Sequence, residues 1–153
     1  MSHSSKRVRQ FLAGSCLDVQ VVTLDDSTRT SQIAADVLGC SVSQIAKSIV
    51  FVDGGAVVVV ISGDKRVDSK EISRLLGEKV RIAHADEVRK YTGYVIGGVP
   101  PFPHVGGVRV LLDSSLSRFE EVWASAGAPN SMMKISVDAI MELVGRDFVD
   151  VAK

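Results

Sequence analysis

Residues 92–104, TGYVIGGVPPFPH, combine glycine and proline with mostly apolar side chains and contain no acidic residue, lysine or arginine. A surface loop is usually polar, and a buried strand rarely carries several prolines. Gly97 and Gly98 allow a ligand to approach the main chain closely. Pro100 and Pro101 fix the backbone without adding competing N–H donors. The stretch therefore predicts a rigid backbone cradle that can orient an ester or stabilise the negative charge developing on its carbonyl oxygen.

Lys47 is the second candidate for chemistry, because it interrupts the otherwise largely apolar residues 45–51. A lysine at such a position can present its ammonium to a ligand. It can equally run its aliphatic stem along apolar surface and place the ammonium in water, which is the commoner arrangement for an arbitrary lysine. Position alone leaves both interpretations open.

Several common catalytic motifs are missing from the chain. It contains neither the GxSxG motif of many hydrolases nor the GxxxxGK[ST] phosphate loop. The glycine pair is not a dinucleotide fingerprint, because the prolines that follow forbid the required helix. His3, His84 and His104 do not have the spacing of metal ligands. We therefore expect no metal site and no cofactor.

Length and charge set further bounds. A chain of 153 residues fits one domain, so we expect residues 1–153 to form a single unit. Acidic and basic residues balance at 18 each, which excludes a strong overall electrostatic attraction to nucleic acid or membrane lipid. Any contact with nucleic acid must be local. No apolar run reaches the ~18 residues of a membrane span, and the first residues do not resemble a signal peptide. The sequence predicts a cytoplasmic protein without membrane association.

Helices are expected where a capping residue precedes apolar residues at helical spacing. Most of these segments end at a glycine that can adopt a left-handed conformation. The expected helices lie between Ser4 or Ser5 and Gly14, between Thr30 or Ser31 and Gly39, from Ser41 or Ser43 through Ser48, between Asp68 and Gly77, over residues 86–90, between Ser114 or Ser115 and Gly127, and from Ser136 through Val144.

Strands are expected where β-branched and other apolar residues cluster between turn signals. Asp53, Gly54 and Gly55 predict a tight hairpin before a valine run that suits a central strand. Lys47 would then lie at a helix-to-strand junction. Hairpins mixed with single helices predict an α+β fold. The expected strands cover residues 18–24, 49–52, 56–61, 79–83, 108–112, 132–135 and 148–152.

Five segments, in this order and spacing, resemble the YbaK-type, prolyl-tRNA-editing family. They are RTSQIAADVLGCSVSQIAKSIVF, ISGDKRVDSKEISRLLG, TGYVIGGVPPF followed by His104, VRVLLDSSL and VWASAGAPNSMMKIS. Members of this family hydrolyse mischarged aminoacyl-tRNA, either in trans or as an insertion in prolyl-tRNA synthetase. The resemblance covers nearly the whole chain.

The resemblance implies a mixed, largely antiparallel sheet rolled toward a barrel with helices around it. It also implies that Lys47 is the principal functional side chain and that residues 97–101 form the GxxxP loop of the family. Such proteins work without a dedicated nucleophile or metal. The loop backbone orients the aminoacyl carbonyl, and a hydroxyl of the terminal adenosine helps to activate water. In some cysteine-specific members the substrate thiol attacks instead. Lys47 would serve as a cation beside the ribose-phosphate or the developing charge.

Four further residues are candidates for substrate binding. His104 can contact substrate or act as a general base, or it can simply face solvent in a loop. The stretch Pro103-His104 departs from many relatives, which carry glycine at the first position, and it stiffens the exit of the loop. Asp113 can orient the lysine or the substrate amino group, or it can start a helix. Ser125 and Gly127 fall where the resemblance places a pocket wall, and Gly127 also suits a helix stop.

Other side chains have weaker claims on function. Trp123, Met132 and Met133 can shape a pocket for a small side chain, although apolar residues at these spacings more often belong to the core. Residues 64–66 and residues 6–9 carry local positive charge that can meet tRNA phosphates. Such charge runs are more often solvated surface.

The leading interpretation is an editing deacylase for mischarged tRNA, with tRNA for proline carrying alanine, cysteine, serine or threonine as the candidate substrate. A second site of this kind is needed because a synthetase pocket cannot strongly reject a smaller or isosteric amino acid. The expected partners are the acceptor end of aminoacyl-tRNA and prolyl-tRNA synthetase. Two alternatives stay open: a non-catalytic module that binds an aminoacyl or nucleotide group, and a hydrolase of another small activated ester.

Overall fold

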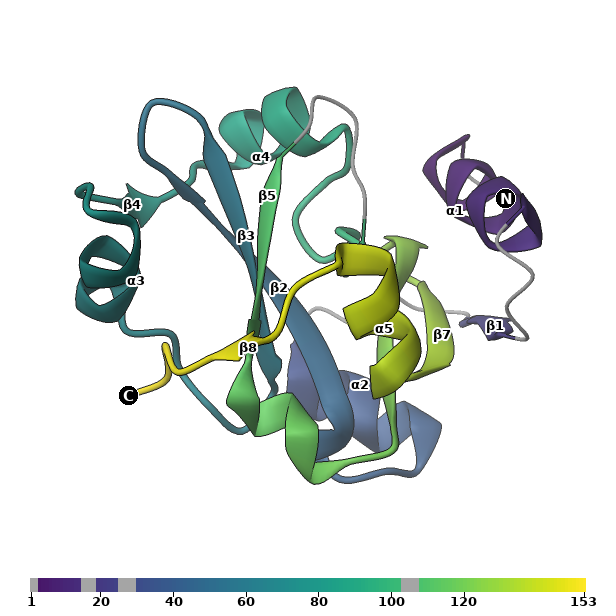
Figure 1. Cartoon of the computed structure of the whole chain (residues 1–153). Coiled ribbons are helices and arrows are strands. Elements are labelled where there is room, and N and C mark those ends of the chain that lie inside the picture. The colour runs from purple at the N-terminus through teal and green to yellow at the C-terminus, as the bar shows by residue number, and fades with distance from the viewer. Residues whose placement is uncertain (1–2, 15–18, 25–29, 103–107) are drawn as a thin grey trace.

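A mixed β-sheet lies at the centre of the fold, with helices around it (Figure 1). The structure is a computed structural model that describes residues 3–14, 19–24, 30–102 and 108–153. Its helices are α1 (His3–Gly14), α2 (Ser31–Leu38), α3 (Ser69–Leu76), α4 (Ala85–Thr92) and α5 (Val137–Val144), together with the 3₁₀ helices η1 (Val42–Gln44) and η2 (Ser114–Arg118). Its strands are β1 (Gln20–Thr23), β2 (Ile45–Val52), β3 (Ala56–Ser62), β4 (Arg81–Ile82), β5 (Arg109–Asp113), β6 (Glu121–Ala128), β7 (Ser131–Ser136) and β8 (Phe148–Val149).

The sheet runs in the order β1-β7-β6-β2-β3-β5-β8, and β4 also pairs with β2. The pairs β1–β7, β7–β6, β2–β3 and β2–β4 are antiparallel. The pairs β2–β6, β3–β5 and β5–β8 are parallel. The predicted α+β class and mixed sheet are confirmed. Within the described residues the sheet stays open, because β1 and β8 end the strand order instead of pairing with each other.

Strand β3 forms the middle of the core. Residues 57–61 are completely buried, and their side chains alternate between two clusters. Val58 and Val60 pack in the larger cluster with residues of β6 and β7, whereas Val57 and Val59 pack beside Ile72 of α3. A strand that is buried on both faces needs apolar side chains at every position, which explains the continuous valine run.

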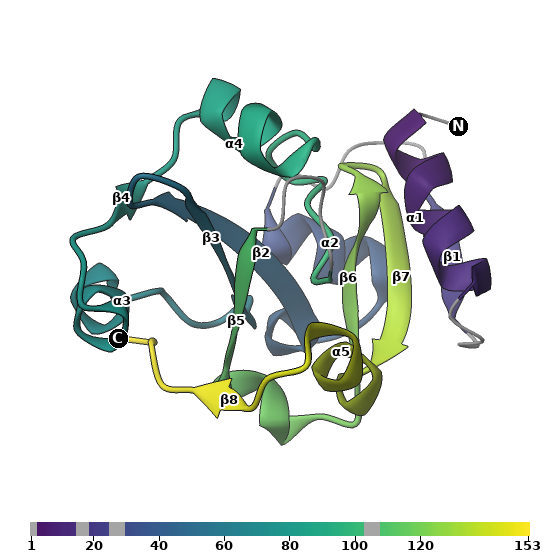
Figure 2. The same cartoon turned by 45° about the horizontal axis from the view of Figure 1, so that its top comes forward.

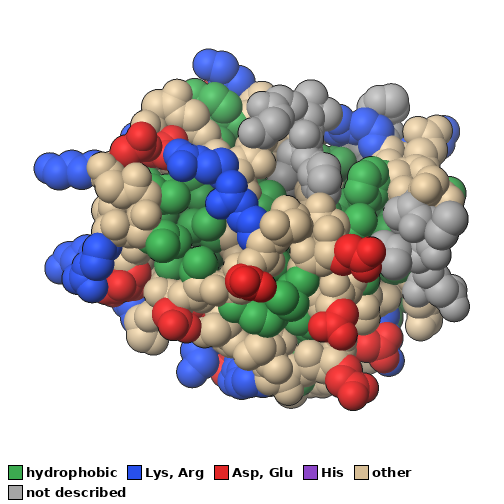
Figure 3. Space-filling model, viewed as in Figure 1, with side chains coloured by type: hydrophobic (Ala, Val, Ile, Leu, Met, Phe, Trp, Pro, Cys, Tyr) green, Lys and Arg blue, Asp and Glu red, His purple; other side chains and the backbone are tan. Residues whose placement is uncertain are grey.

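The helices cover the ends and faces of this sheet. In Figure 2, α1 lies beside β7 and β6 at one end of the molecule, and α3 lies at the other. Three of the predicted caps are present, since the side chains of Thr30, Asp68 and Ser136 accept hydrogen bonds from backbone N–H groups in the first turns of α2, α3 and α5. The predicted helix start at Ser4 or Ser5 is wrong, because α1 begins at His3. On the face shown in Figure 3, acidic and basic side chains are interspersed around hydrophobic areas, in line with the zero net charge.

The predicted helix from Ser41 or Ser43 through Ser48 is wrong. The helical part is only η1, and β2 begins at Ile45, so Lys47 lies within a strand. Lys47 is opposite Ile61 of β3, in a ladder that continues to the hairpin. This pairing along nearly the whole of β3 outweighs the local helical pattern.

The predicted helix between Ser114 or Ser115 and Gly127 is also wrong. It is replaced by η2 and the strand β6. Gly127 is therefore not a helix stop: it has a φ of 104° and lies where the register of β6 and β7 shifts. Strand β6 pairs with β7 on one side and with β2 on the other, and this tertiary pairing decides its conformation.

The core face of α2 consists of small side chains. Ile33 and Val37 are 42% and 57% exposed. Ala34 and Ala35 are buried. The helix thus packs against the sheet through its smallest side chains, which permits a close approach.

Candidate functional site

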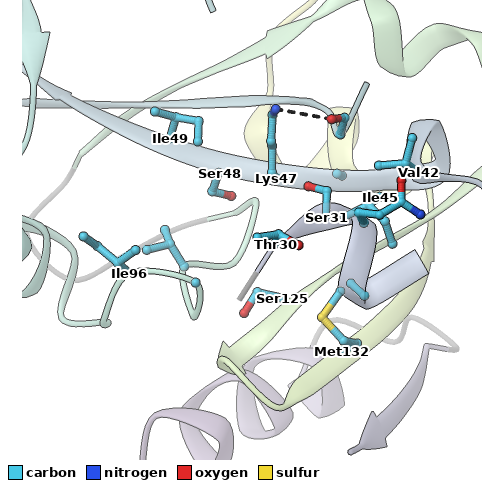
Figure 4. A pocket seen from close by; sticks show the side chains of 16 residues that line it. Thr30, Ser31, Val42, Ile45, Lys47, Ser48, Ile49, Ile96, Ser125 and Met132 are labelled. Carbon is cyan, nitrogen blue, oxygen red and sulfur yellow. Dashed lines mark hydrogen bonds between the residues drawn. The ribbon is translucent and has the colours of Figure 1, made fainter. Parts of the chain in front are cut away.

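A pocket of about 580 Å³ lies where α2, β2 and the loop after α4 meet. We call it the Lys47 pocket. Figure 4 shows Lys47 and Ser48 pointing away from opposite faces of β2, so the pocket borders both faces of this strand. The other side chains and backbone segments that line it belong to Thr30, Ser31, Gln32, Ala34, Val42, Ile45, Ala46, Ile49, Gly63, Ile96, Gly97, Val99, Ser125 and Met132.

Within the described part of the chain, Lys47 has one weak polar contact. Its Nζ donates a long hydrogen bond of 3.4 Å to the carbonyl oxygen of Gly63 (Figure 4). Burial lowers the pKa of the ammonium below its usual value; Arg66 acts in the same direction and Asp64 opposes them. Among the described residues, no carboxylate lies within ion-pair distance of Nζ. The cation is therefore available to a ligand that brings negative charge.

Asp64 is the acidic neighbour that could have neutralised Lys47, but it is bound elsewhere. Its two carboxylate oxygens accept hydrogen bonds of 2.8 and 3.1 Å from the guanidinium of Arg118. This hydrogen bonding is the main cause of the lowered pKa of Asp64. A bidentate arginine pair is geometrically specific, so Arg118 keeps the carboxylate away from the lysine.

Gly63 is a site residue that sequence reasoning did not identify. A Cβ at this position would lie 2.5 Å from the carbonyl oxygen of Val42 and 2.7 Å from Cβ of Ser31. Only glycine fits between η1 and α2 here, and its carbonyl is the one that contacts Lys47. The available signal was a glycine placed directly after the central valine strand.

The two glycines of the predicted cradle have different roles in the structure. Gly97 lines the Lys47 pocket and has a φ of 85°, a backbone conformation that side chains disfavour. A Cβ on Gly98 would lie 3.0 Å from Cα of Ala128, so Gly98 allows the loop to pack on the turn between β6 and β7. Its N–H already donates to the carbonyl of Val95. The backbone at Gly97 therefore faces the pocket, whereas Gly98 packs the loop against the backbone of Ala128.

Pro100 and Pro101 are buried and lie outside the lining of the Lys47 pocket. The next residue, Phe102, is 1% exposed and stacks on Phe11 of α1 with 5.0 Å between ring centroids. The prolines thus lead the chain into the core and fix the loop from one end. Ile96, on the other side of the glycine pair, is 59% exposed.

Ser125 also lines the Lys47 pocket. Its Oγ accepts a hydrogen bond from the N–H of Gly127 at 3.3 Å and donates one to the carbonyl of Ala128 at 3.4 Å. Gly127 does not line the pocket, but its left-handed backbone turns its N–H toward Ser125. The bulge in β6 therefore holds the serine in place.

Asp113 lies away from the Lys47 pocket and is 1% exposed. One carboxylate oxygen accepts a hydrogen bond from the N–H of Ser115, and the other accepts one from the N–H of Val151, both at 2.9 Å. The side chain ties the end of β5 to the start of η2 and to the C-terminal segment. His104 lies outside the described residues.

The pocket contains one more polar side chain that sequence reasoning did not identify. The hydroxyl oxygen of Ser48 is buried and has no hydrogen-bond partner among the described residues. Met132 lines the Lys47 pocket, whereas Met133 is fully buried in the core and Trp123 lines a separate cavity beside Cys40. Nothing in the sequence distinguished these positions, because their roles depend on which face of a strand they occupy.

Within the part of the chain that the structure describes, no group of three or more His, Cys, Asp and Glu side chains is placed to hold a metal ion. No helix there has both the length and the apolar character needed to cross a membrane.

Comparison with known proteins places the chain in a family. The family model for the aminoacyl-tRNA editing domain matches residues 25–143. EbsC of Enterococcus faecalis, provisionally named a Cys-tRNA(Pro)/Cys-tRNA(Cys) deacylase, is 26% identical over 80% of this chain and 76% of its own. The multifunctional Ser/Thr-tRNA deacylase ProXp-y of Escherichia coli is 27% identical over 82% and 79%.

The fold comparison agrees with the sequence comparison. A crystal structure provisionally described as a trans-editing enzyme for prolyl-tRNA synthetase matches with a TM-score of 0.92 and 37% identity. That match covers 100% of this chain and 99% of the other. The resemblance predicted from the five sequence segments is thereby confirmed, and the chain belongs to the aminoacyl-tRNA editing domain family.

Proposed function

We propose that the protein hydrolyses the ester bond of mischarged aminoacyl-tRNA at the Lys47 pocket. The observation that carries this proposal is a half-buried lysine that has no carboxylate partner among the described residues, in the same pocket as the backbone of Gly97. A buried cation left unpaired is costly to the fold, which is typical of a site that completes its charge balance with a ligand. The acceptor end of tRNA brings such charge on its phosphates.

In the proposed reaction, water adds to the aminoacyl carbonyl carbon, the ester C–O bond breaks, and the ribose hydroxyl and the free amino acid leave. The backbone at Gly97 orients the carbonyl, and the ammonium of Lys47 stabilises the phosphate or the developing oxyanion. A neighbouring hydroxyl of the terminal adenosine assists the attacking water. An aminoacyl ester is already activated, so positioning and electrostatic stabilisation can supply the required acceleration.

The end of the pocket beside α2 suits a small amino-acid side chain. Ala34, Ile45 and Met132 close it, and they are only 3%, 3% and 4% exposed. The related proteins described above are named for Cys-tRNA and for Ser/Thr-tRNA. We propose tRNA for proline carrying alanine, cysteine, serine or threonine as the substrate. We further propose that residues 1–153 act as one editing domain in the cytoplasm, with prolyl-tRNA synthetase as the candidate partner.

A substrate panel tests this function. The protein is offered mischarged tRNAs and the corresponding free amino-acid esters, and release of each amino acid is measured. Selective release from tRNA is expected. Release from the small esters alone would mean a different ester hydrolase, and release from none would mean a binding module.

Lys47→Ala tests the site in the same assay. We expect a loss of roughly 100-fold to 1,000-fold in deacylation, the range observed when one group that stabilises an oxyanion is removed. The circular dichroism spectrum should be unchanged. Lys70→Ala, which removes an exposed lysine from α3, is the matched control and should retain activity. Full turnover by Lys47→Ala would contradict the assignment.

A further inference from the structure

A small second cavity opens beside the Lys47 pocket. It has a volume of about 100 Å³ and shares Ser48, Ile49, Ile96 and Val99 with that pocket. We call it the apolar slot. Its remaining walls come from β2, β4 and α4, and they are formed by Val50, Ile82, Ala83 and Val88.

The apolar slot lies where, among the residues that the structure describes, no strand pairs with β2 along part of one edge. On this edge β2 pairs with β6 at Ile45 and Ala46, and with β4 at Phe51 and Val52. The carbonyl of Val50 faces this side, where it accepts a hydrogen bond from Ala83. Because backbone groups alternate along a strand, Ser48 presents its N–H and C=O to the same side. The interruption joins the apolar slot to the Lys47 pocket.

The Lys47 pocket and the apolar slot together have two apolar ends, and these ends differ in how exposed their side chains are. Toward α2, the apolar lining side chains Ala34, Ile45 and Met132 are almost fully buried, as described above. At the apolar slot, Ile82 and Ile96 are 62% and 59% exposed. These two isoleucines form the two lips of the slot. One end of the site can enclose a small group, whereas the other can only cover a face of a larger one.

We infer that the apolar slot receives the purine base of the 3′-terminal adenosine, an inference that rests on the proposed function. The ribose that carries the scissile ester has two substituents with apolar surface, the aminoacyl side chain and the base. A side chain that is selected by size needs a closed pocket. The terminal base of a polynucleotide needs an open slot, because the remaining nucleotides must extend from the site into solvent.

The chemistry of the apolar slot fits a base. Its branched aliphatic side chains offer flat contact surface to a ring, and dispersion contacts of this kind add up over a base face. Its single polar side chain, Ser48, has a buried hydroxyl oxygen without a partner in the described structure. The edge of a purine carries both hydrogen-bond donors and acceptors, and either can satisfy a hydroxyl.

Two substrates that differ only in the alcohol part test the inference. They are the 3′-aminoacyl-adenosine and the methyl ester of the same amino acid, and the measured quantity is the ratio of their kcat/KM values. Ile82→Ser removes a lip that lines the apolar slot but not the Lys47 pocket. We expect this ratio to fall roughly fivefold to tenfold, the lower range of base-stacking contributions. Ile82→Tyr should keep or raise the ratio, because a ring stacks at least as well.

Leu75→Ser is the matched control, since Leu75 of α3 is also half exposed and lines neither cavity. It should leave the ratio unchanged. An unchanged ratio for Ile82→Ser, or an equal loss on both esters, would overturn the inference; the second result would place the aminoacyl group in the slot.

A binding experiment separates this inference from the proposed function. The non-hydrolysable amide 3′-alanylamino-3′-deoxyadenosine is added while the methyl signals of Ile82 and Ile96 are followed by NMR. Shifts of both signals support the inference, even if the wild-type protein hydrolyses neither ester and the proposed function fails. Saturating addition without a shift of either signal overturns it.

Discussion

Lys47 and Asp113 are two charged side chains removed from water in very different ways. Asp113 is almost fully buried, and each of its oxygens accepts a hydrogen bond from a backbone N–H. Lys47 is half buried and has one long contact with a carbonyl. A satisfied buried charge stabilises the chain that surrounds it, whereas an unsatisfied one is a cost that a ligand can remove. The difference separates a structural aspartate from a candidate catalytic lysine, although both looked plausible as site residues in the sequence.

Replacing Asp113 should give the largest loss of stability. Asp113→Ala leaves the N–H groups of Ser115 and Val151 without their acceptor in a buried environment, and we expect a loss of about 2–4 kcal/mol in the free energy of unfolding. Urea denaturation followed by circular dichroism measures it. Asp147→Ala, at an exposed position, serves as control. If the folded fraction of Asp113→Ala also loses its deacylase activity per molecule, Asp113 has a functional role as well and the contrast with Lys47 fails.

Gly97 and Gly98 differ in a similar way: Gly97 lines the pocket, whereas Gly98 packs against the turn between β6 and β7. Gly98→Ala would place a methyl group 3.0 Å from Cα of Ala128, a backbone atom that cannot move aside easily. We expect a destabilisation of about 1–3 kcal/mol, as for other overpacked sites. Gly14→Ala is the control, because a Cβ there meets nothing within 4 Å. Thermal unfolding of both variants checks the prediction, and equal melting temperatures would contradict the close packing.

Replacing Arg118 offers a way to give the Lys47 ammonium a polar partner, as Asp113 already has. Arg118→Met releases the carboxylate of Asp64, which can then move toward the ammonium. The pKa of Lys47 should rise, because the opposing effect of Asp64 becomes stronger. Deacylation should fall severalfold as the cation becomes paired. Side-chain NMR titration follows the lysine, with Arg74→Met as a control that breaks only an exposed pair. A lower pKa of Lys47 in Arg118→Met would refute this arrangement.

The smallest expected effect is on the pH dependence of stability. The pKa of Lys47 in the folded protein lies below the ordinary value of 10.5 because of burial. Below the folded pKa, both states of the wild type carry the charge and the folded state bears its burial cost. As the pH rises through the folded pKa, the folded state loses its proton first, so the wild type gains stability relative to Lys47→Met. Denaturation at neutral pH and just below pH 10.5 should show the advantage of Lys47→Met shrinking. A growing advantage would mean that the folded protein favours the charged lysine.

Local signals in the sequence predicted three of the helix starts. Thr30, Asp68 and Ser136 cap helices as expected, because a cap depends on residues within one turn of each other. The segment that became β6 was mistaken for a helix, since its apolar spacing suits both structures and only pairing with β7 and β2 decides between them. The same limit applied to Lys47, which belongs to a strand.

Part of the candidate site could be anticipated for similar reasons. Lys47, Gly97 and Ser125 were named from the sequence and line one pocket; their roles in catalysis stay predictions. Gly63 and Ser48 were missed because their importance arises from distant neighbours, such as Val42 and Ser31 around Gly63. The placement of Asp113 away from the pocket also depends on long-range contacts, namely those with the C-terminal segment.

The interruption along one edge of β2 has a consequence for self-association. Unpaired strand edges can template the addition of strands from other molecules, and proteins usually cover or shorten them. Among the described residues, four lie between the pairings with β6 and β4, residues 47–50, and the carbonyl of Val50 already accepts a hydrogen bond from Ala83. An opening this short, flanked by strands on both sides, cannot accept another strand. The interruption therefore opens the sheet beside the Lys47 pocket without offering an edge long enough for strands of other molecules to add.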